Sequence, residues 1–113
     1  MQLSDQLFKK LDEASKNWSE WQKKTIILEE GKKATYSKCF LKYKLETKTV
    51  IEAEHKARLD AEYIKVVKDY AEAEEQLTKA KFHYNNIDRY VSSDVNIILR
   101  FLRLRFHLLN PAT

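Results

Sequence analysis

The chain contains a single glycine, Gly31, and a single proline, Pro111, so the residues that most often form turns are almost absent. Strand hairpins depend on such residues, which argues against a β-rich fold. Charged residues make up 34% of the chain, and the abundant Lys, Glu, Ala, Leu and Gln side chains lose little freedom in a helix. The length of 113 residues suits one core. We therefore predict a single all-α domain over residues 1–113.

A stripe of mostly apolar residues with the spacing of a coiled-coil seam runs through the first third of the chain. Its members are Leu3, Leu7, Leu11, Ala14, Trp18, Trp21, Thr25 and Leu28. The stripe predicts a helix over about 3–30, and Gly31 is the expected stop because glycine adopts the left-handed conformation after a helix end at little cost. Trp18 and Trp21 lie about one turn apart, which favours helix packing, although such a pair can also stack bases or dock a peptide.

Residues 32–91 contain neither glycine nor proline. A single helix over this range would be about 90 Å long. The run is therefore either one long helix of an elongated hairpin that pairs with another chain, or two helices. The candidate breaks are residues 46–50, where two threonines and a valine lower helix propensity, then 85–86, and finally 92–94, which can cap a last helix over 94–109.

Two further stripes predict that the chain self-associates. One consists of Tyr63, Val67, Tyr70, Glu74, Leu77, Ala80, Tyr84, Ile87 and Val91, with Ala73 beside its acidic member, and the other of Tyr36, Phe40, Tyr43, Thr47 and Val50. A helix over 3–30 is too short to cover both, so we expect an elongated helical hairpin or small bundle with coiled-coil-like packing, completed by a homo-oligomer, most simply a dimer. The expected partner or oligomer interface comprises Trp18, Trp21, Tyr63, Tyr70, Leu77, Tyr84, Phe101, Leu104 and Leu108.

The net charge of +4 is modest, but basic residues cluster in two places. Lysines alternate with aromatic residues at Lys38, Phe40, Lys42, Tyr43 and Lys44, and arginines occur at Arg100, Arg103 and Arg105. Such residues can grip phosphates and stack bases. A solvated helical surface explains the lysine cluster equally well, and we prefer that interpretation because the aromatic residues follow a packing stripe.

Few residues suggest chemistry. Cys39 is the only cysteine, so an intrachain disulfide is excluded and a reducing, cytoplasmic setting is expected. Glu52 and His55 form a Glu-x-x-His pair, but a di-metal bundle needs a second such pair, which His83 and His107 do not supply. One glycine cannot build a phosphate-binding loop. We predict neither an enzyme nor a metal or cofactor, and we find no signal peptide or membrane-spanning stretch.

The closing stretch NIILRFLRLRFHLLNPAT, residues 96–113, is basic and apolar without an acid. In a helix Arg100, Arg103 and His107 share one face, the apolar residues gather opposite, and Arg105 falls within the apolar arc. The stretch also alternates like a strand, but a lone strand would lack a partner. The apolar face must cover something: the long helix, a partner protein, or an anionic membrane surface. Direct phosphate binding by the arginines is a further alternative.

Residues 50–93, VIEAEHKARLDAEYIKVVKDYAEAEEQLTKAKFHYNNIDRYVSS, resemble small helical proteins encoded by tailed bacteriophages. The resemblance implies a small, elongated, oligomeric protein in the host cytoplasm, of a group generally without an assigned activity and without catalytic residues to transfer. Proteins of that kind often occur among genes that handle phage DNA or disarm host defences. The polar helical pattern of the group continues past the position of Asp94, whereas this chain turns apolar there.

The sequence therefore predicts a non-enzymatic helical interaction protein that self-associates and binds a partner protein such as a host or defence factor, and the resemblance implies a phage origin. The alternative is an accessory nucleic-acid-binding protein that uses Lys38, Lys42, Tyr43, Lys44, Arg100, Arg103 and Arg105.

Overall fold

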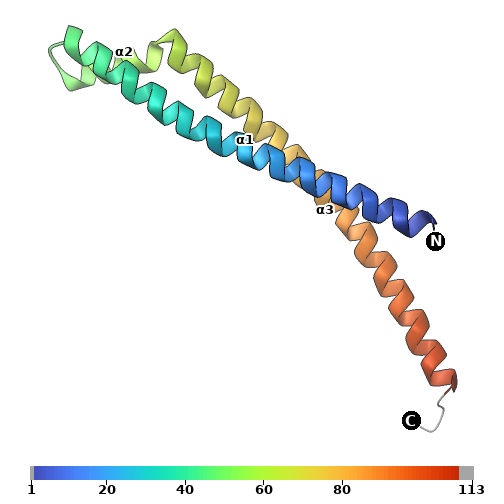
Figure 1. Cartoon of the computed structure of the whole chain (residues 1–113). Coiled ribbons are helices and arrows are strands. Elements are labelled where there is room, and N and C mark those ends of the chain that lie inside the picture. Colours follow the sequence, from blue (N-terminus) through green and yellow to red (C-terminus); the bar gives the residue numbers. More distant parts are fainter. Residues whose placement is uncertain (1, 110–113) are drawn as a thin grey trace.

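The computed structural model contains three helices: α1 (Gln2–Glu46), α2 (Val50–Leu59) and α3 (Ala61–Leu109) (Figure 1). It describes the backbone of residues 2–109 and the side chains of residues 5–103. α1 and α3 form a long antiparallel hairpin, and α2 lies at its closed end beside the last turns of α1 (Figure 1). The all-α class predicted from the sequence is confirmed for the described residues.

The hairpin is strongly elongated, with extents of 87 × 29 × 14 Å. Its radius of gyration is 25.3 Å, about twice the roughly 13 Å of a compact domain of this length. A molecule of this shape has little interior, because α1 and α3 face each other along most of the hairpin and α2 packs only at its closed end.

The expected helix end at Gly31 is wrong, since α1 continues through Gly31 to Glu46. No residue in the described part of the chain has the positive φ that a glycine stop would require. Helix-forming residues flank Gly31 on both sides, and they outweigh the cost of roughly 1 kcal/mol for one glycine in a helix. Lys32 occupies the next position of the stripe, and its ammonium lies 4.3 Å from the centre of the Tyr70 ring on α3.

The predicted break at residues 46–50 is confirmed. After Glu46, the Thr47 N–H and hydroxyl both donate to the Tyr43 carbonyl oxygen, at 2.9 and 2.8 Å. Thr49 has an extended backbone and caps α2, with its hydroxyl oxygen accepting from the Glu52 N–H at 3.2 Å. A second break, which the sequence interpretation missed, falls at Asp60, whose extended backbone separates α2 from α3.

The breaks expected at 85–86 and 92–94 are wrong, and so is a separate helix over 94–109, because α3 continues through both segments to Leu109. The stripe explains this continuity. Tyr84 and Ile87 are half-buried and Val91 is buried, so burial of the helical face outweighs the weak propensity of the asparagines and serines between and after them.

The buried positions are almost all small. Among the described side chains these positions are Ala14, Thr25, Cys39, Ala53, Ala57, Ala73, Ala80 and Val91. The larger stripe residues, such as Trp18, Leu28 and Leu77, are half-buried. Small residues let the helices approach closely while the larger side chains cover the edges of the contact. The α3 stripe is therefore confirmed with one correction: Ala73 is buried and Glu74 is exposed.

Gly31→Ala should stabilise the protein by about 1 kcal/mol, because alanine has the higher helix propensity and a Cβ at this position meets nothing within 4 Å. Thermal and urea unfolding followed by circular dichroism will measure the gain. Ala34→Gly, three residues further along an exposed part of the same helix, is the matched control and should lose a similar amount. Destabilisation by Gly31→Ala would mean that this glycine forms a turn.

Candidate functional site

Aromatic residues of the expected interface lie inside the hairpin. The rings of Trp18 on α1 and Tyr84 on α3 are 5.1 Å apart between centroids and tilted by 45°. Tyr36 and Tyr63 meet edge to face at 5.4 Å. These contacts show that Trp18, Tyr63 and Tyr84 pack within one chain, a geometry typical of stabilising aromatic pairs.

Three further interface candidates, Trp21, Tyr70 and Leu77, are half-buried on the same contact between α1 and α3. Lys24 is on the same helix as Trp21, and its ammonium lies 4.6 Å from the centroid of the Trp21 ring. A hydrogen bond to Glu74, together with partial burial, raises the pKa of Tyr70 to about 12. These three residues therefore serve the hairpin, and any role between chains stays a prediction.

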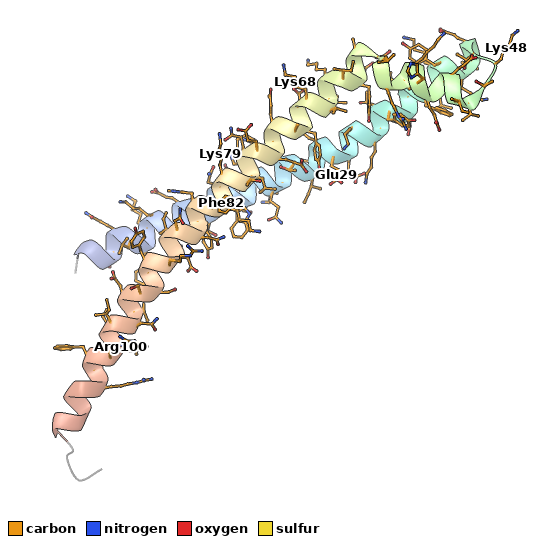
Figure 2. All side chains as sticks on the ribbon, turned by 180° about the vertical axis from the view of Figure 1, so that it is seen from behind. Glu29, Lys48, Lys68, Lys79, Phe82 and Arg100 are labelled. Carbon is orange, nitrogen blue, oxygen red and sulfur yellow. The ribbon has the colours of Figure 1, made fainter. Side chains whose placement is uncertain are left out.

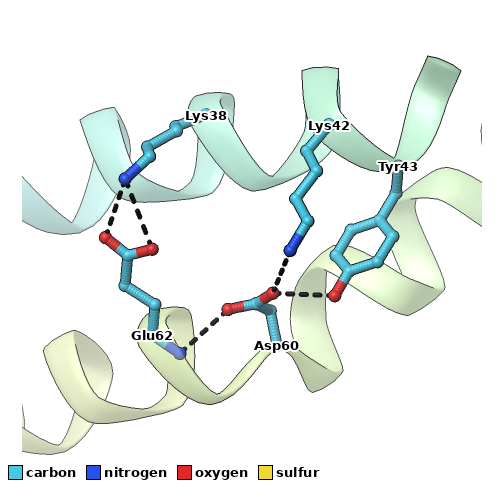
Figure 3. Close-up of polar contacts among 5 residues, drawn as sticks. All are labelled: Lys38, Lys42, Tyr43, Asp60 and Glu62. Atoms are coloured by element: carbon cyan, nitrogen blue, oxygen red, sulfur yellow. Dashed lines mark hydrogen bonds and ion pairs between the residues drawn. The ribbon is translucent and has the colours of Figure 1, made fainter.

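A polar cluster surrounds Asp60 at the junction of α2 and α3 (Figure 3). The Tyr43 hydroxyl donates to Asp60 Oδ2 at 2.7 Å, and the Glu62 backbone N–H donates to Asp60 Oδ1 at 2.9 Å. Lys42 Nζ lies 3.8 Å from Oδ2. The hydrogen bond from Tyr43, followed by that from Glu62, lowers the pKa of the Asp60 carboxyl below its ordinary value. Asp60 thus caps the start of α3 and ties it to α1.

The lysine and aromatic cluster proposed for nucleic acid is partly used by this junction. Lys38 Nζ lies 3.1 Å from Glu62 Oε1, Lys42 faces Asp60, and the Tyr43 hydroxyl is bound to the same carboxylate (Figure 3). Lys44 is exposed. Two of the three lysines therefore have an acidic neighbour, which reduces the positive potential available to a phosphate.

Cys39 is buried behind this cluster, with 3% of its surface exposed. Its sulfur and one oxygen from each of Asp60 and Glu62 lie within 4.8 Å of one another. Burial, and then the charge of Asp60, raises the pKa of the Cys39 thiol, whereas a metal ligand must be a thiolate. Both carboxylates already accept hydrogen bonds, from Tyr43 and Lys38. We assign the cluster to the folding of the junction.

Sequence reasoning missed Asp60 because it occurs inside a charge-rich run. One local signal was present: an aspartate immediately before Ala-Glu-Tyr is a typical helix N-cap. Glu52 and His55, the pair weighed for a di-metal site, are both exposed on α2.

The last part of α3 presents the largest group of exposed apolar residues that follow one another in the chain. We call residues 95–109 the terminal arm. Its exposed apolar residues among the described side chains are Val95, Ile97, Ile98, Leu99, Phe101 and Leu102, and Arg100 and Arg103 are exposed between them. The expected interface and phosphate-binding residues Leu104, Arg105 and Leu108 belong to α3, but their side chains lie outside the described residues.

The arm is exposed because α1 and α3 diverge at this end of the hairpin (Figures 1 and 2). Figure 2 shows Arg100 on a stretch of α3 that stands clear of α1. At the fork, a small hollow is lined by Leu7, Phe8, Val91, Asp94, Val95 and Ile98. Phe101 does not pack against α1, since 66% of its surface is exposed.

Comparison with protein-family models, curated proteins and solved structures finds no match to this chain. The resemblance of residues 50–93 to small phage proteins therefore stays a prediction. None of the three helices, as far as the structure describes them, has an apolar stretch long enough to span a membrane.

Asp60→Asn should flatten the acid limb of the stability profile. A carboxyl with a lowered pKa stabilises the fold above its unfolded pKa of about 3.9, and this contribution disappears as the pH falls through the lower folded value. The wild type should therefore lose stability more steeply below about pH 4 than Asp60→Asn, and the variant should melt a few degrees lower at pH 7. Urea unfolding between pH 2.5 and 7 measures the acid limb, and thermal unfolding at pH 7 measures the change in melting temperature.

Asp12→Asn is the matched control, because Asp12 is an exposed carboxylate that pairs only with Lys16 on its own helix, at 3.0 Å. Its acid limb should follow that of the wild type. Equal acid limbs for the wild type and Asp60→Asn would contradict a role for Asp60 in holding α3 to α1.

Proposed function

We propose that the chain is a non-enzymatic helical interaction protein that self-associates through its terminal arm and binds a partner protein. The observation that carries the proposal is the arm itself. Six large apolar residues are exposed on it over about two helical turns, at the fork and beyond it. Each large apolar side chain contributes roughly 1.5 to 3 kcal/mol when it is fully buried. Contiguous exposed apolar surface of this kind marks interaction sites in soluble proteins.

A second group of exposed apolar residues, at the closed end of the hairpin, supports a further contact with another protein. It consists of Leu41, Leu45, Val50, Ile51 and Leu59, on α1 and α2. Leu45 is the most exposed of them, at 90%. An elongated molecule with apolar surface at both ends suits a role in which one end joins two copies and the other contacts a different protein.

Phe101→Gln should weaken self-association at least about tenfold, because a phenylalanine in the centre of an interface contributes 1.4 kcal/mol or more. Sedimentation equilibrium between about 1 and 200 μM measures the dissociation constant. Phe82→Gln is a close control, since Phe82 lies on the same helix outside the arm and is 64% exposed against 66% for Phe101. It should change the constant less than twofold. A wild type that stays monomeric throughout this range would overturn self-association.

Partner binding needs its own experiment. Cross-linking with mass spectrometry should recover a partner protein with the full chain and lose it with a variant that carries Leu45→Gln and Ile51→Gln. The mass of this variant in solution should equal that of the wild type. A partner retained equally by both would remove the closed end from the proposal.

Accessory nucleic-acid binding is a second candidate, favoured by Arg100 and Arg103, which are exposed in a stretch without acidic residues. Arg100→Gln combined with Arg103→Gln should then weaken binding to duplex or single-stranded DNA at 50 mM salt and reduce its salt dependence by about two charges. Gel-shift titration against salt measures this. Lys42→Gln should have a smaller effect, because Lys42 faces Asp60. Absence of any shift at low salt would dispose of this candidate.

A further inference from the structure

The terminal arm continues the same face of α3 that packs against α1. The half-buried and buried positions of α3 repeat at intervals of three and four residues through Tyr84, Ile87, Val91 and Asp94. The same spacing continues into the arm through Ile98, which borders the hollow at the fork and is partly exposed, and Phe101, which is more exposed beyond it. A face that binds a helix over most of its length is shaped for a helix where it is exposed.

The register of the hairpin shows which part of α3 lies alongside α1. Trp18 lies beside Tyr84, and Tyr36 lies beside Tyr63. Because the two helices advance at the same rise per residue, this register carries the start of α1 to a point near Arg100. The remainder of α3, which ends at Leu109, extends past its partner in the chain.

Helical periodicity places two positions with charged residues in the middle of the apolar arc. At about 100° per residue, Asp94 and Arg105 are separated by close to three helical turns, so they lie on one side of α3. The apolar arc runs on both sides of that line, through Ile97 and Phe101 on one flank and Val95 and Leu102 on the other. Arg100 and Arg103 lie on the opposite face, where they stay in water.

Asp94 is only partly exposed and borders the apolar hollow at the fork, beside Leu7 and Phe8. A carboxylate beside apolar side chains is a favourable partner for a cation that lies close to it. Among the described residues, the structure gives Asp94 no ion pair. An arginine lying across the mouth of the hollow would cover the apolar residues with its stem and pair its guanidinium with the carboxylate.

We propose that the terminal arms of two copies pair antiparallel, with Arg105 of each copy opposite Asp94 of the other. The pairing rests on the proposed self-association and specifies its geometry. Antiparallel alignment of 94 with 105 centres the contact between residues 99 and 100, and it places Ile98 opposite Phe101 of the second copy. A parallel pair would instead set Asp94 against Asp94 and Arg105 against Arg105, which is repulsive.

A second copy fits this face better than an anionic membrane does. A membrane-bound amphipathic helix keeps its apolar arc free of charge and carries its basic residues at the edges. Here an acid and a base both lie in the middle of the arc, and insertion would carry both into lipid. Two arms of about 22 Å each form a small contact, to which the exposed Phe8 at the fork adds. Such a contact fits a dissociation constant in the micromolar range.

Charge reversal tests the pairing directly. Asp94→Arg and Arg105→Asp should each raise the dissociation constant at least about tenfold, because each brings like charges together twice in the symmetric contact. The chain that carries both reversals should return to within about threefold of the wild type. An equimolar mixture of the two single variants should form a heterodimer of similar strength, because every contact then joins an arginine to an aspartate. Sedimentation equilibrium and native mass spectrometry measure these quantities.

Arg103→Asp is the matched control, since it changes the net charge as Arg105→Asp does but acts on the opposite face, and it should alter the constant less than threefold. Circular dichroism should show unchanged helix content in every variant. The pairing is overturned if the dimer tolerates both single reversals, or if neither the double variant nor the mixture restores the affinity that the single variants lose. It is also overturned if the wild type binds vesicles of anionic phospholipid as a monomer. A wild type that never dimerises would also remove the proposed self-association, whereas a charge-insensitive dimer removes only this pairing.

Discussion

The structure depends on a single line of contact between two long antiparallel helices. Each helix can bury only the side that faces the other, so the contact contains small residues such as Ala73 and Ala80 while Trp18 and Leu77 remain half-exposed. A two-helix arrangement offers no third surface to enclose a large side chain. The elongated shape and the large exposed apolar surface both follow from this one limit.

The closed end shows how the chain turns without glycine or proline. Thr47, Thr49 and Asp60 each supply a side-chain oxygen that bonds to nearby backbone and replaces the helical pattern locally. Asp60 does more than cap α3, because Tyr43 and Lys42 reach it from α1. The same carboxylate therefore starts one helix and fixes its position against the other, so Lys42 contributes to the folding of this junction.

Regular spacing made much of the fold predictable. The stripes through Trp18 and Tyr84 identified the two faces that meet, and weak helix propensity located the break at 46–50 correctly. Gly31 misled because the stripe continues beyond it through Lys32, a charged residue that packs by lying over Tyr70 rather than by being apolar. Asp60 was missed for a similar reason, since its effect comes from contacts across the hairpin. The apolar character of the closing stretch was read from the sequence, and its described apolar residues are exposed on α3, but nothing in the local sequence reveals that α3 diverges from α1 there.

The divergence of α1 and α3 at the open end of the hairpin is what leaves an apolar helical surface exposed on this molecule. Had Gly31 ended the first helix, α3 would have been uncovered along half its length and the chain would have needed a bundle of several copies. Because α1 continues to Glu46, it covers α3 from the junction to the fork near Asp94, and the main groups of exposed apolar residues lie in the terminal arm and at the closed end. A short exposed helix at one extremity favours a contact between two molecules, since a second copy can cover it without disturbing the hairpin. The continuity of α1 through a glycine thus determines how much of α3 is covered within the chain.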